Sequence, residues 1–199
     1  TATFKATRII NGHSVERMPK KQLDFRISHR FGEINRGAYE FFGLDYSTIH
    51  LSLEYGITDW LMAGVGRSSF EKTIDGFTKF SIMRQSSGAR NMPVHLSLLL
   101  AAECYGLKWE DQTQKNYFSS RLSWVSQLLI ARKFSNSLSL QLTPTFIHRN
   151  FVPTALDPND LYALGAGARY KLTQRISLNA EYFWVYHLNA GYLDVQYYN

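Results

Sequence analysis

The chain of 199 residues is rich in apolar and aromatic residues and carries a modest positive charge. A hydrophobic content of 45% with 15% aromatic residues excludes a disordered chain, and a single cysteine excludes an internal disulfide or a thiolate metal cluster. The net charge of +6 comes from basic residues scattered singly among aromatic and acidic ones, which argues against a nucleic-acid partner. No apolar run approaches the roughly 18 to 20 residues of a spanning helix, so a helical membrane protein is excluded.

Alternation of apolar and polar residues with a period of two dominates the sequence from residue 22 onward. This pattern is typical of β-strands, because successive side chains of a strand point to opposite faces. It predicts nine strands and a weaker tenth, and it leaves the facing of the glycine-containing third strand open. The predicted strands are 22–31, 47–58, 60–70, 77–84, 94–104, 118–131, 138–143, 162–172, 176–186 and 192–198.

The connections between these strands alternate in length. Long polar links at 32–46, 105–116 and 149–160 interleave with short ones at 58–59, 133–136 and 173–175. The link at 85–93 is an exception, because it is long although it lies at the end of the short links. Alternating long and short connections are typical of an up-and-down outer-membrane barrel, with long loops outside and short turns in the periplasm. Most runs also approach the about 9 to 11 residues that a tilted strand needs to cross the hydrocarbon layer, whereas soluble strands average about 5 to 6.

Aromatic residues mark the ends of the predicted strands. Such rings suit the two interfacial girdles of a membrane barrel, since their apolar body stays in lipid and their polar tip lies near the headgroups. Ordinary packing in a soluble core is the alternative interpretation. The residues concerned are Trp60, Tyr105, Trp109, Tyr117, Phe118, Tyr162, Tyr170, Trp184 and Tyr186.

If the apolar rows face lipid, charged residues of both signs face the lumen and form an ion-pair network there. We expect Arg26 or Arg30 to reach Glu54, and Arg169 or Lys171 to reach Glu181, because the strands concerned are neighbours. Interleaved charges in a barrel of about ten strands favour a locked interior over a water-filled path, since wide channels need about 16 strands or more. The predicted network comprises Asp24, Arg26, Arg30, His50, Glu54, Glu103, Arg121, Arg169, Lys171 and Glu181.

Two histidine–serine pairs resemble parts of a catalytic site. His50 and Ser52 share a strand face, as do His95 and Ser97, which is a feature of membrane-embedded lipid hydrolases and acyltransferases. Positions i and i+2 of a strand lie roughly 6.5 to 7 Å apart, so their spacing does not imply the direct hydrogen bond that nucleophilic catalysis needs. We therefore predict no enzyme, no catalytic residues, no cofactor and no metal site. An enzyme would lose phospholipid turnover when Ser52 or Ser97 is replaced by alanine.

Five segments resemble an uncharacterised family of outer-membrane β-barrel proteins from the Bacteroidota, a domain of unknown function. They are 24–32 (DFRISHRFG), 42–45 (FGLD), 55–59 (YGITD), 66–69 (GRSS) and 79–80 (KF). The resemblance runs from about residue 3 through the ninth strand. It implies an outer-membrane location and no assigned activity, so no functional residues follow from it.

These observations predict an all-β, transmembrane, up-and-down antiparallel barrel formed by residues 22–199, with residues 1–21 as a periplasmic or lumen-plugging lead. The chain starts at Thr1 without an initiator Met and ends at Asn199 without a terminal aromatic residue, so we expect a processed polypeptide that lacks its last strand or strands. Ten strands are expected here and ten to twelve in the whole protein.

We expect a structural or accessory barrel in the outer membrane of a Gram-negative bacterium, with its N-terminus in the periplasm. It would act alone or as a subunit of a larger outer-membrane complex. Its expected partners are outer-membrane lipid, lipopolysaccharide and other outer-membrane proteins. The alternative is a narrow porin-like pore for small solutes, and a lipid-modifying enzyme comes third.

Overall fold

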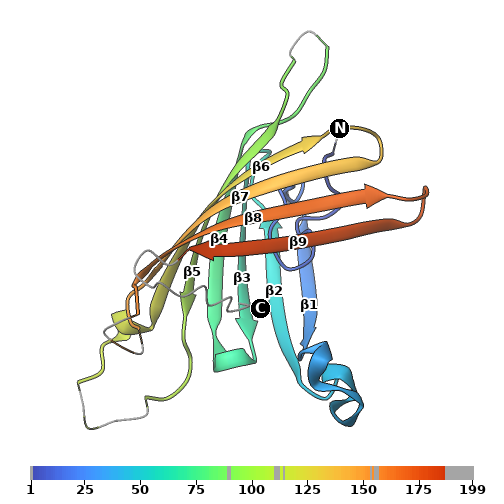
Figure 1. Cartoon of the computed structure of the whole chain (residues 1–199). Coiled ribbons are helices and arrows are strands. Elements are labelled where there is room, and N and C mark those ends of the chain that lie inside the picture. Colours follow the sequence, from blue (N-terminus) through green and yellow to red (C-terminus); the bar gives the residue numbers. More distant parts are fainter. Residues whose placement is uncertain are drawn as a thin grey trace.

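A computed structural model describes residues 2–88, 91–109, 113, 115–152, 154 and 157–186. It contains one antiparallel sheet in which each strand pairs with its neighbours in sequence (Figure 1). Within the described residues the sheet has nine strands, which confirms the predicted all-β, up-and-down architecture. The strands are β1 (Leu23–Phe31), β2 (Ser47–Gly56), β3 (Leu61–Ser68), β4 (Ile74–Met83), β5 (His95–Cys104), β6 (Leu122–Lys133), β7 (Leu138–Arg149), β8 (Asp160–Lys171) and β9 (Ser177–Tyr186).

Helical structure in the described residues is limited to four short 3-10 turns in the connections: η1 (Ile34–Arg36), η2 (Ala38–Gly43), η3 (Phe70–Lys72) and η4 (Phe118–Arg121). None of the helices found in these residues has the length and hydrophobicity to cross a membrane.

Most strand boundaries agree with the alternation pattern, with three clear differences. β4 begins three residues before the predicted start at Phe77, and β6 begins at Leu122 because residues 118–121 form η4 instead. β7 extends to Arg149, well past the predicted end at Thr143. The predicted tenth strand, 192–198, lies outside the described residues.

Pro144 lies inside β7, where a residue without a backbone N–H is unexpected. Its side chain is on the exposed face, and pairing with β6 is interrupted beside it, between the pairs Gln127–Thr145 and Ile130–Leu142. Pairing with β8 continues through Pro144. The strand therefore tolerates the proline because its hydrogen-bonded pairing with β6 is interrupted there. The alternation of the sequence does not predict this interruption.

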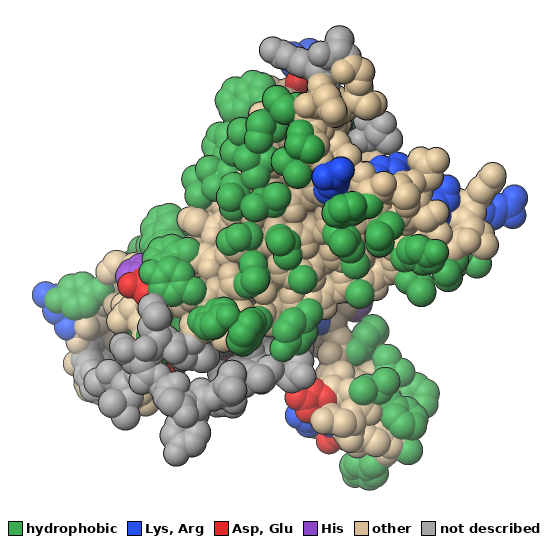
Figure 2. Space-filling model, turned by 45° about the horizontal axis from the view of Figure 1, so that its top comes forward, with side chains coloured by type: hydrophobic (Ala, Val, Ile, Leu, Met, Phe, Trp, Pro, Cys, Tyr) green, Lys and Arg blue, Asp and Glu red, His purple; other side chains and the backbone are tan. Residues whose placement is uncertain are grey.

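The two faces of the sheet have opposite chemistry. On β1, exposed Leu23, Phe25 and Ile27 alternate with the less exposed Asp24 and Arg26, and the same alternation continues around the sheet. We call the apolar side the outer face and the polar side the inner face. Hydrophobic side chains cover much of the outer surface (Figure 2). This distribution is the reverse of a water-soluble core and suits a lipid environment.

The third strand, whose facing the sequence left open, follows the same rule. Met62 and Gly64 of β3 are buried on the inner face, while Val65 is exposed on the outer face. Gly64 has no side chain because the Phe77 ring of the paired strand occupies that space: a Cβ at Gly64 would lie 2.4 Å from the ring. Gly64 therefore makes room for Phe77 of β4, and Gly66 does the same for His50 of β2.

The connections define two ends of the sheet. One end, which we call the short-turn end, holds the links 57–60, 84–94, 134–137 and 172–176; the other, the long-loop end, holds 32–46, 69–73, 105–121 and 150–159. In this meander of nine strands, β1 and β9 both run from the short-turn end to the long-loop end. Antiparallel closure between these two edges would therefore require an odd number of further strands.

Candidate functional site

The N-terminal segment, residues 2–21, lies against the inner face of the sheet (Figure 1), and several of its residues are buried there. Residues 7–14 form a small hairpin, in which the Ile9 amide donates to the Gly12 carbonyl and the Ser14 amide to the Thr7 carbonyl, each at 2.9 Å. Phe4 and Val15 are buried, and they belong to one apolar cluster with inner-face residues of the wall. The segment is thus packed against the strands.

Lys79 of β4 is fully buried and donates to three backbone carbonyls of the N-terminal segment. Its Nζ lies 3.3 Å from the Thr7 oxygen, 2.9 Å from the Ser14 oxygen and 2.8 Å from the Glu16 oxygen. An ammonium group has three N–H donors, so this cradle satisfies all of them. A buried charge is costly unless it is paired or hydrogen-bonded, so the segment and Lys79 depend on each other.

Glu54 of β2 is the acidic counterpart on the inner face and is also fully buried. Its carboxylate accepts a hydrogen bond from the Thr7 hydroxyl at 2.9 Å and pairs with the Arg8 guanidinium at 3.1 Å. Arg26 of β1 lies 3.7 Å from the same carboxylate and donates to the Thr7 hydroxyl at 3.0 Å. Charged groups of the segment and the wall therefore share one network.

Glu181 of β9 binds the tip of the hairpin from the opposite side of the sheet. Its carboxylate accepts hydrogen bonds from the amides of Ile10, Asn11 and Gly12, at 2.8 to 3.2 Å. Successive backbone amides that converge in this way form a site for an anion. Because Glu54 and Glu181 lie on distant strands, the hairpin bridges the two sides of the wall.

Gln141 of β7 binds the second arm of the hairpin at residues 13–15. Its amide oxygen accepts from the Val15 amide at 2.9 Å, and its amide nitrogen donates to the His13 carbonyl at 2.8 Å. On β5, the Ser97 hydroxyl donates to the Val15 carbonyl at 3.1 Å. Three strands thus bind the backbone of this arm, counting Lys79 on β4.

Glu16 folds back onto the start of the N-terminal segment. Its carboxylate accepts from the Thr3 amide at 2.6 Å and from the Phe4 amide at 3.2 Å. His95 of β5 lies 3.9 Å from the same carboxylate, and Arg84 lies at 4.0 Å. This carboxylate therefore fixes the first residues of the segment beside β5.

His13 is half-buried between the hairpin and the inner face of the sheet. Its ring meets the Phe77 ring edge-on at 4.4 Å, and burial together with nearby Arg8 and Lys79 lowers the pKa of His13 well below 6.5. A cation at this position would be surrounded by other cations, so the ring is neutral when the segment is docked.

The long-loop end of the inner face has a different set of contacts. His50 of β2 pairs with Asp75 of β4 at 2.6 Å. Arg121 donates to the carbonyls of Tyr105 and Leu107 and lies over the Trp109 ring, 4.2 Å from its centre. The N-terminal segment makes none of these contacts, so this half of the wall is held by its own strands and loops.

Some members of the predicted ion-pair network meet their expected partners, and others do not. Arg26 does reach Glu54, and it also pairs with Asp24 at 2.8 Å. The expected partners of Glu181 were wrong, because its carboxylate binds hairpin amides and the described structure shows no ion pair to it from Arg169 or Lys171. Arg30, His50 and Glu103 lie on the inner face towards the long-loop end, whereas Arg121 belongs to η4 in the loop between β5 and β6.

Three central residues, Lys79, Arg8 and Glu16, were missing from the predicted network. The predicted fourth strand, 77–84, carried no assignment of its faces, so Lys79 was not placed on the inner side. Arg8 and Glu16 lie in a segment without strand alternation. The alternation of Asp75, Phe77 and Lys79 from the true start of β4 is the signal that could have found Lys79.

The two histidine–serine pairs contribute to other contacts. Ser97 donates its hydroxyl proton to the Val15 carbonyl, and His95 approaches Glu16. His50 pairs with Asp75, while Ser52 is buried. Across the part of the chain that the structure describes, no cluster of three or more His, Cys, Asp or Glu side chains could hold a metal ion.

An antiparallel meander with an apolar outer face and a polar inner face defines a membrane protein of the β-barrel class. Residues 4–199 match the family described as "Membrane bound beta barrel domain (DUF5777)", and the chain belongs to this family. This confirms the predicted membership of a membrane β-barrel family of unknown function. Comparison with curated proteins and with solved structures gave no match.

Proposed function

We propose that this protein is a structural or accessory barrel of the outer membrane whose N-terminal segment closes its interior. The observation that carries the proposal is the docking of that segment, which binds side chains of β1, β2, β4, β5, β7 and β9. A segment held from so many strands leaves a narrow barrel little room for solutes.

The connections support the proposed orientation. Single-chain outer-membrane barrels have short periplasmic turns and long external loops, which puts the short-turn end and the N-terminal segment on the periplasmic side. The exposed apolar outer face supports contact with outer-membrane lipid and lipopolysaccharide. The resemblance in the sequence supports a Gram-negative host of the Bacteroidota.

The protein would act alone or as a subunit of a larger outer-membrane complex, without catalytic activity. Ser97 and His95 support a non-enzymatic role, because both contact the N-terminal segment. A charge network that binds the chain's own backbone rigidifies the interior, which supports a structural role over the turnover of a substrate.

Single-channel recording of the full chain in a planar bilayer tests the proposal. We expect a membrane without steady open conductance, because the docked segment occupies the interior. Steady conductance of the wild-type chain would contradict the closed barrel and favour the narrow pore. Phospholipid turnover that is lost in Ser97→Ala would instead favour a lipid-modifying enzyme.

A further inference from the structure

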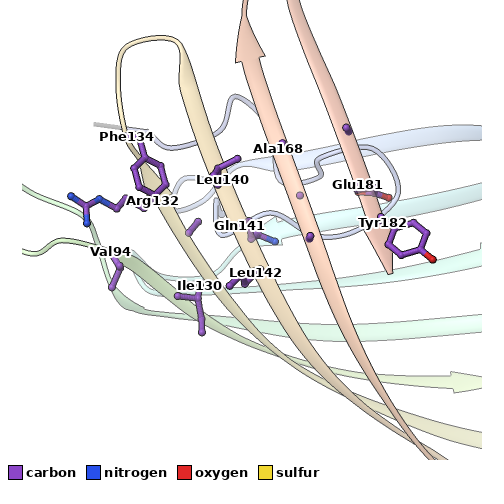
Figure 3. Close-up of a pocket in the computed structure, with 14 residues that line it drawn as sticks. Val94, Ile130, Arg132, Phe134, Leu140, Gln141, Leu142, Ala168, Glu181 and Tyr182 are labelled. Carbon is purple, nitrogen blue, oxygen red and sulfur yellow. The ribbon is translucent and has the colours of Figure 1, made fainter. Parts of the chain in front are cut away.

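An apolar hollow lies in the outer face at the short-turn end of β6, β7, β8 and β9. Its volume is about 500 Å³, which is within the range of about 300 to 1,000 Å³ that ligand pockets have. Most of the residues that line it are apolar, among them Ile130, Leu142 and Tyr182 (Figure 3), and Arg132, Gln141 and Glu181 are the exceptions. The hollow therefore suits a hydrocarbon group.

The strand register explains why the wall is hollowed at this place. Ala168 of β8 is paired with Leu140 on one side and with Ala180 on the other, so two small residues adjoin in one row. In the next row towards the short turns, Tyr170 is paired with Leu138 and Leu178. These three large residues do not line the hollow, which lies over the small side chains of Ala168 and Ala180.

In the second row of the hollow, a small residue lies between two large ones. Ala166 is paired with Leu142 on β7 and with Tyr182 on β9. Leu142 and Tyr182 are exposed to 52% and 53%, although both are large. In water such an exposed apolar depression would be unfavourable, whereas in a bilayer an acyl chain can fill it.

A basic residue stands at the rim of the hollow. Arg132 of β6 is exposed on the outer face, directly opposite Leu140 in the register. Its guanidinium lies over the Phe134 ring, 5.1 Å from the centre, and among the described residues no carboxylate forms an ion pair with it. Figure 3 shows Arg132 and Phe134 together near the turn between β6 and β7.

An arginine on the lipid-facing side is tolerated near the membrane interface, where it can meet a headgroup. Arginine binds phosphate with two parallel hydrogen bonds. A phosphodiester would therefore neutralise the positive charge of Arg132, with which no carboxylate among the described residues pairs. A zwitterionic lipid has the same phosphate but also a positively charged ammonium group, which Arg132 would repel. The rim therefore favours a lipid with net negative charge.

We propose that this hollow is a binding site for one anionic phospholipid, with an acyl chain in the apolar depression and the phosphate at Arg132. The inference rests on the proposed placement of the outer face in lipid. The lipid site is tested by the retention of lipid, whereas the closed interior is tested by conductance. A failure of one proposal can therefore be distinguished from a failure of the other.

Native mass spectrometry of the full chain tests the proposal, with the protein in detergent and equal amounts of phosphatidylglycerol and phosphatidylcholine. We expect the complex with one phosphatidylglycerol to exceed that with phosphatidylcholine about fivefold, which is the ratio that about 1 kcal/mol for one basic residue at a charged membrane surface provides. The variant Arg132→Gln should equalise the two lipids. Arg67→Gln removes an outer-face arginine of β3 away from the hollow and should behave like the wild type.

A second pair of variants tests the hydrocarbon part of the site. Ala168→Phe fills the hollow and should remove most of the retained lipid of both kinds, whereas Ala63→Phe makes the same change on the outer face of β3 and should not. Equal retention of the two lipids by the wild type would overturn the proposal. So would equal effects of the two arginine variants, equal effects of the two alanine variants, or a dimer of the chain without lipid.

Discussion

The two halves of the inner face use their charges differently. At the short-turn half, Lys79 and Glu181 bind backbone groups of the N-terminal segment. At the long-loop half, His50 binds Asp75 of the same wall and Arg121 binds carbonyls of its own loop. Charges of the first kind fix a separate segment, and those of the second kind fix the wall itself. Substitutions in the two halves should therefore have separable effects.

The largest expected effect comes from Lys79→Met. The change leaves the carbonyls of Ser14 and Glu16 without the donor that Lys79 supplies, while the Thr7 carbonyl keeps the Ser14 amide. Each unsatisfied buried group costs about 1 to 3 kcal/mol, so we expect a loss on the order of 3 kcal/mol. Denaturant unfolding in detergent measures the loss, and limited proteolysis detects release of the N-terminal segment. Lys171→Met, at an inner-face lysine of β8, is the matched control and should change neither readout.

Glu54→Gln should have the next largest effect. The amide keeps a hydrogen bond to Thr7 but leaves Arg8 without its carboxylate, and hydrogen bonds to charged groups contribute about 1.5 to 3 kcal/mol, so a loss of about 2 kcal/mol is expected. Unfolding measured in parallel with Glu103→Gln, at the long-loop half, would show the difference. Equal release of the segment by both variants would break the distinction between the two halves.

Glu181→Ala should loosen only the tip of the hairpin. The amides of Ile10, Asn11 and Gly12 lose their acceptor, for which we expect about 1.5 kcal/mol because the group is partly exposed. Hydrogen exchange resolved by residue should show faster exchange at these amides and unchanged exchange at Val15. Uniformly faster exchange would mean that β9 is essential for docking of the whole segment.

Acidification should weaken docking through His13. The docked ring has its pKa held well below 6.5 by burial and by the cations Arg8, Lys79 and Arg26, whereas the released ring takes up a proton near pH 6.5. Stability is therefore complete above that pH and falls as the pH drops, by about 0.8 kcal/mol at pH 6. Proteolysis of the segment at pH 7.5 and pH 6 measures this. In His13→Phe the extra loss should disappear, and an unchanged pH dependence would contradict the assignment.

His50→Asn should have the smallest effect on the segment. It removes the pair with Asp75 at the long-loop half, where the N-terminal segment makes no contact. Hydrogen exchange of residues 3–16 should stay within about 0.5 kcal/mol of the wild type. A large increase would show that the two halves are coupled through the wall.

The architecture was predictable from the sequence because alternation encodes facing directly. Rows such as Leu23, Phe25 and Ile27 opposite Asp24 and Arg26 determine both faces of a strand without knowledge of its neighbours. The end of β7 was missed because Pro144 argues against a continued strand, although only the pairing with β6 is interrupted there. Local patterns therefore predicted the wall but did not reveal how neighbours compensate.

The candidate site was only partly predictable. The contact between Arg26 and Glu54 followed from strand order, since neighbouring strands bring their inner residues together. The role of Glu181 did not follow, because its partners are backbone amides, which carry no residue-type signal. Lys79 likewise binds carbonyls, so a search for opposite charges cannot find it.

The docking of the N-terminal segment on the inner face is tested most directly by hydrogen–deuterium exchange of the full chain in lipid bilayers. The amides of Thr3, Phe4 and Val15 are bound by buried Glu16 and Gln141, so we predict exchange as slow as that of the central residues of β4 and β5. Exchange of residues 3–16 at the rate of an unstructured peptide, with slow exchange in the strands, would contradict the plugged barrel.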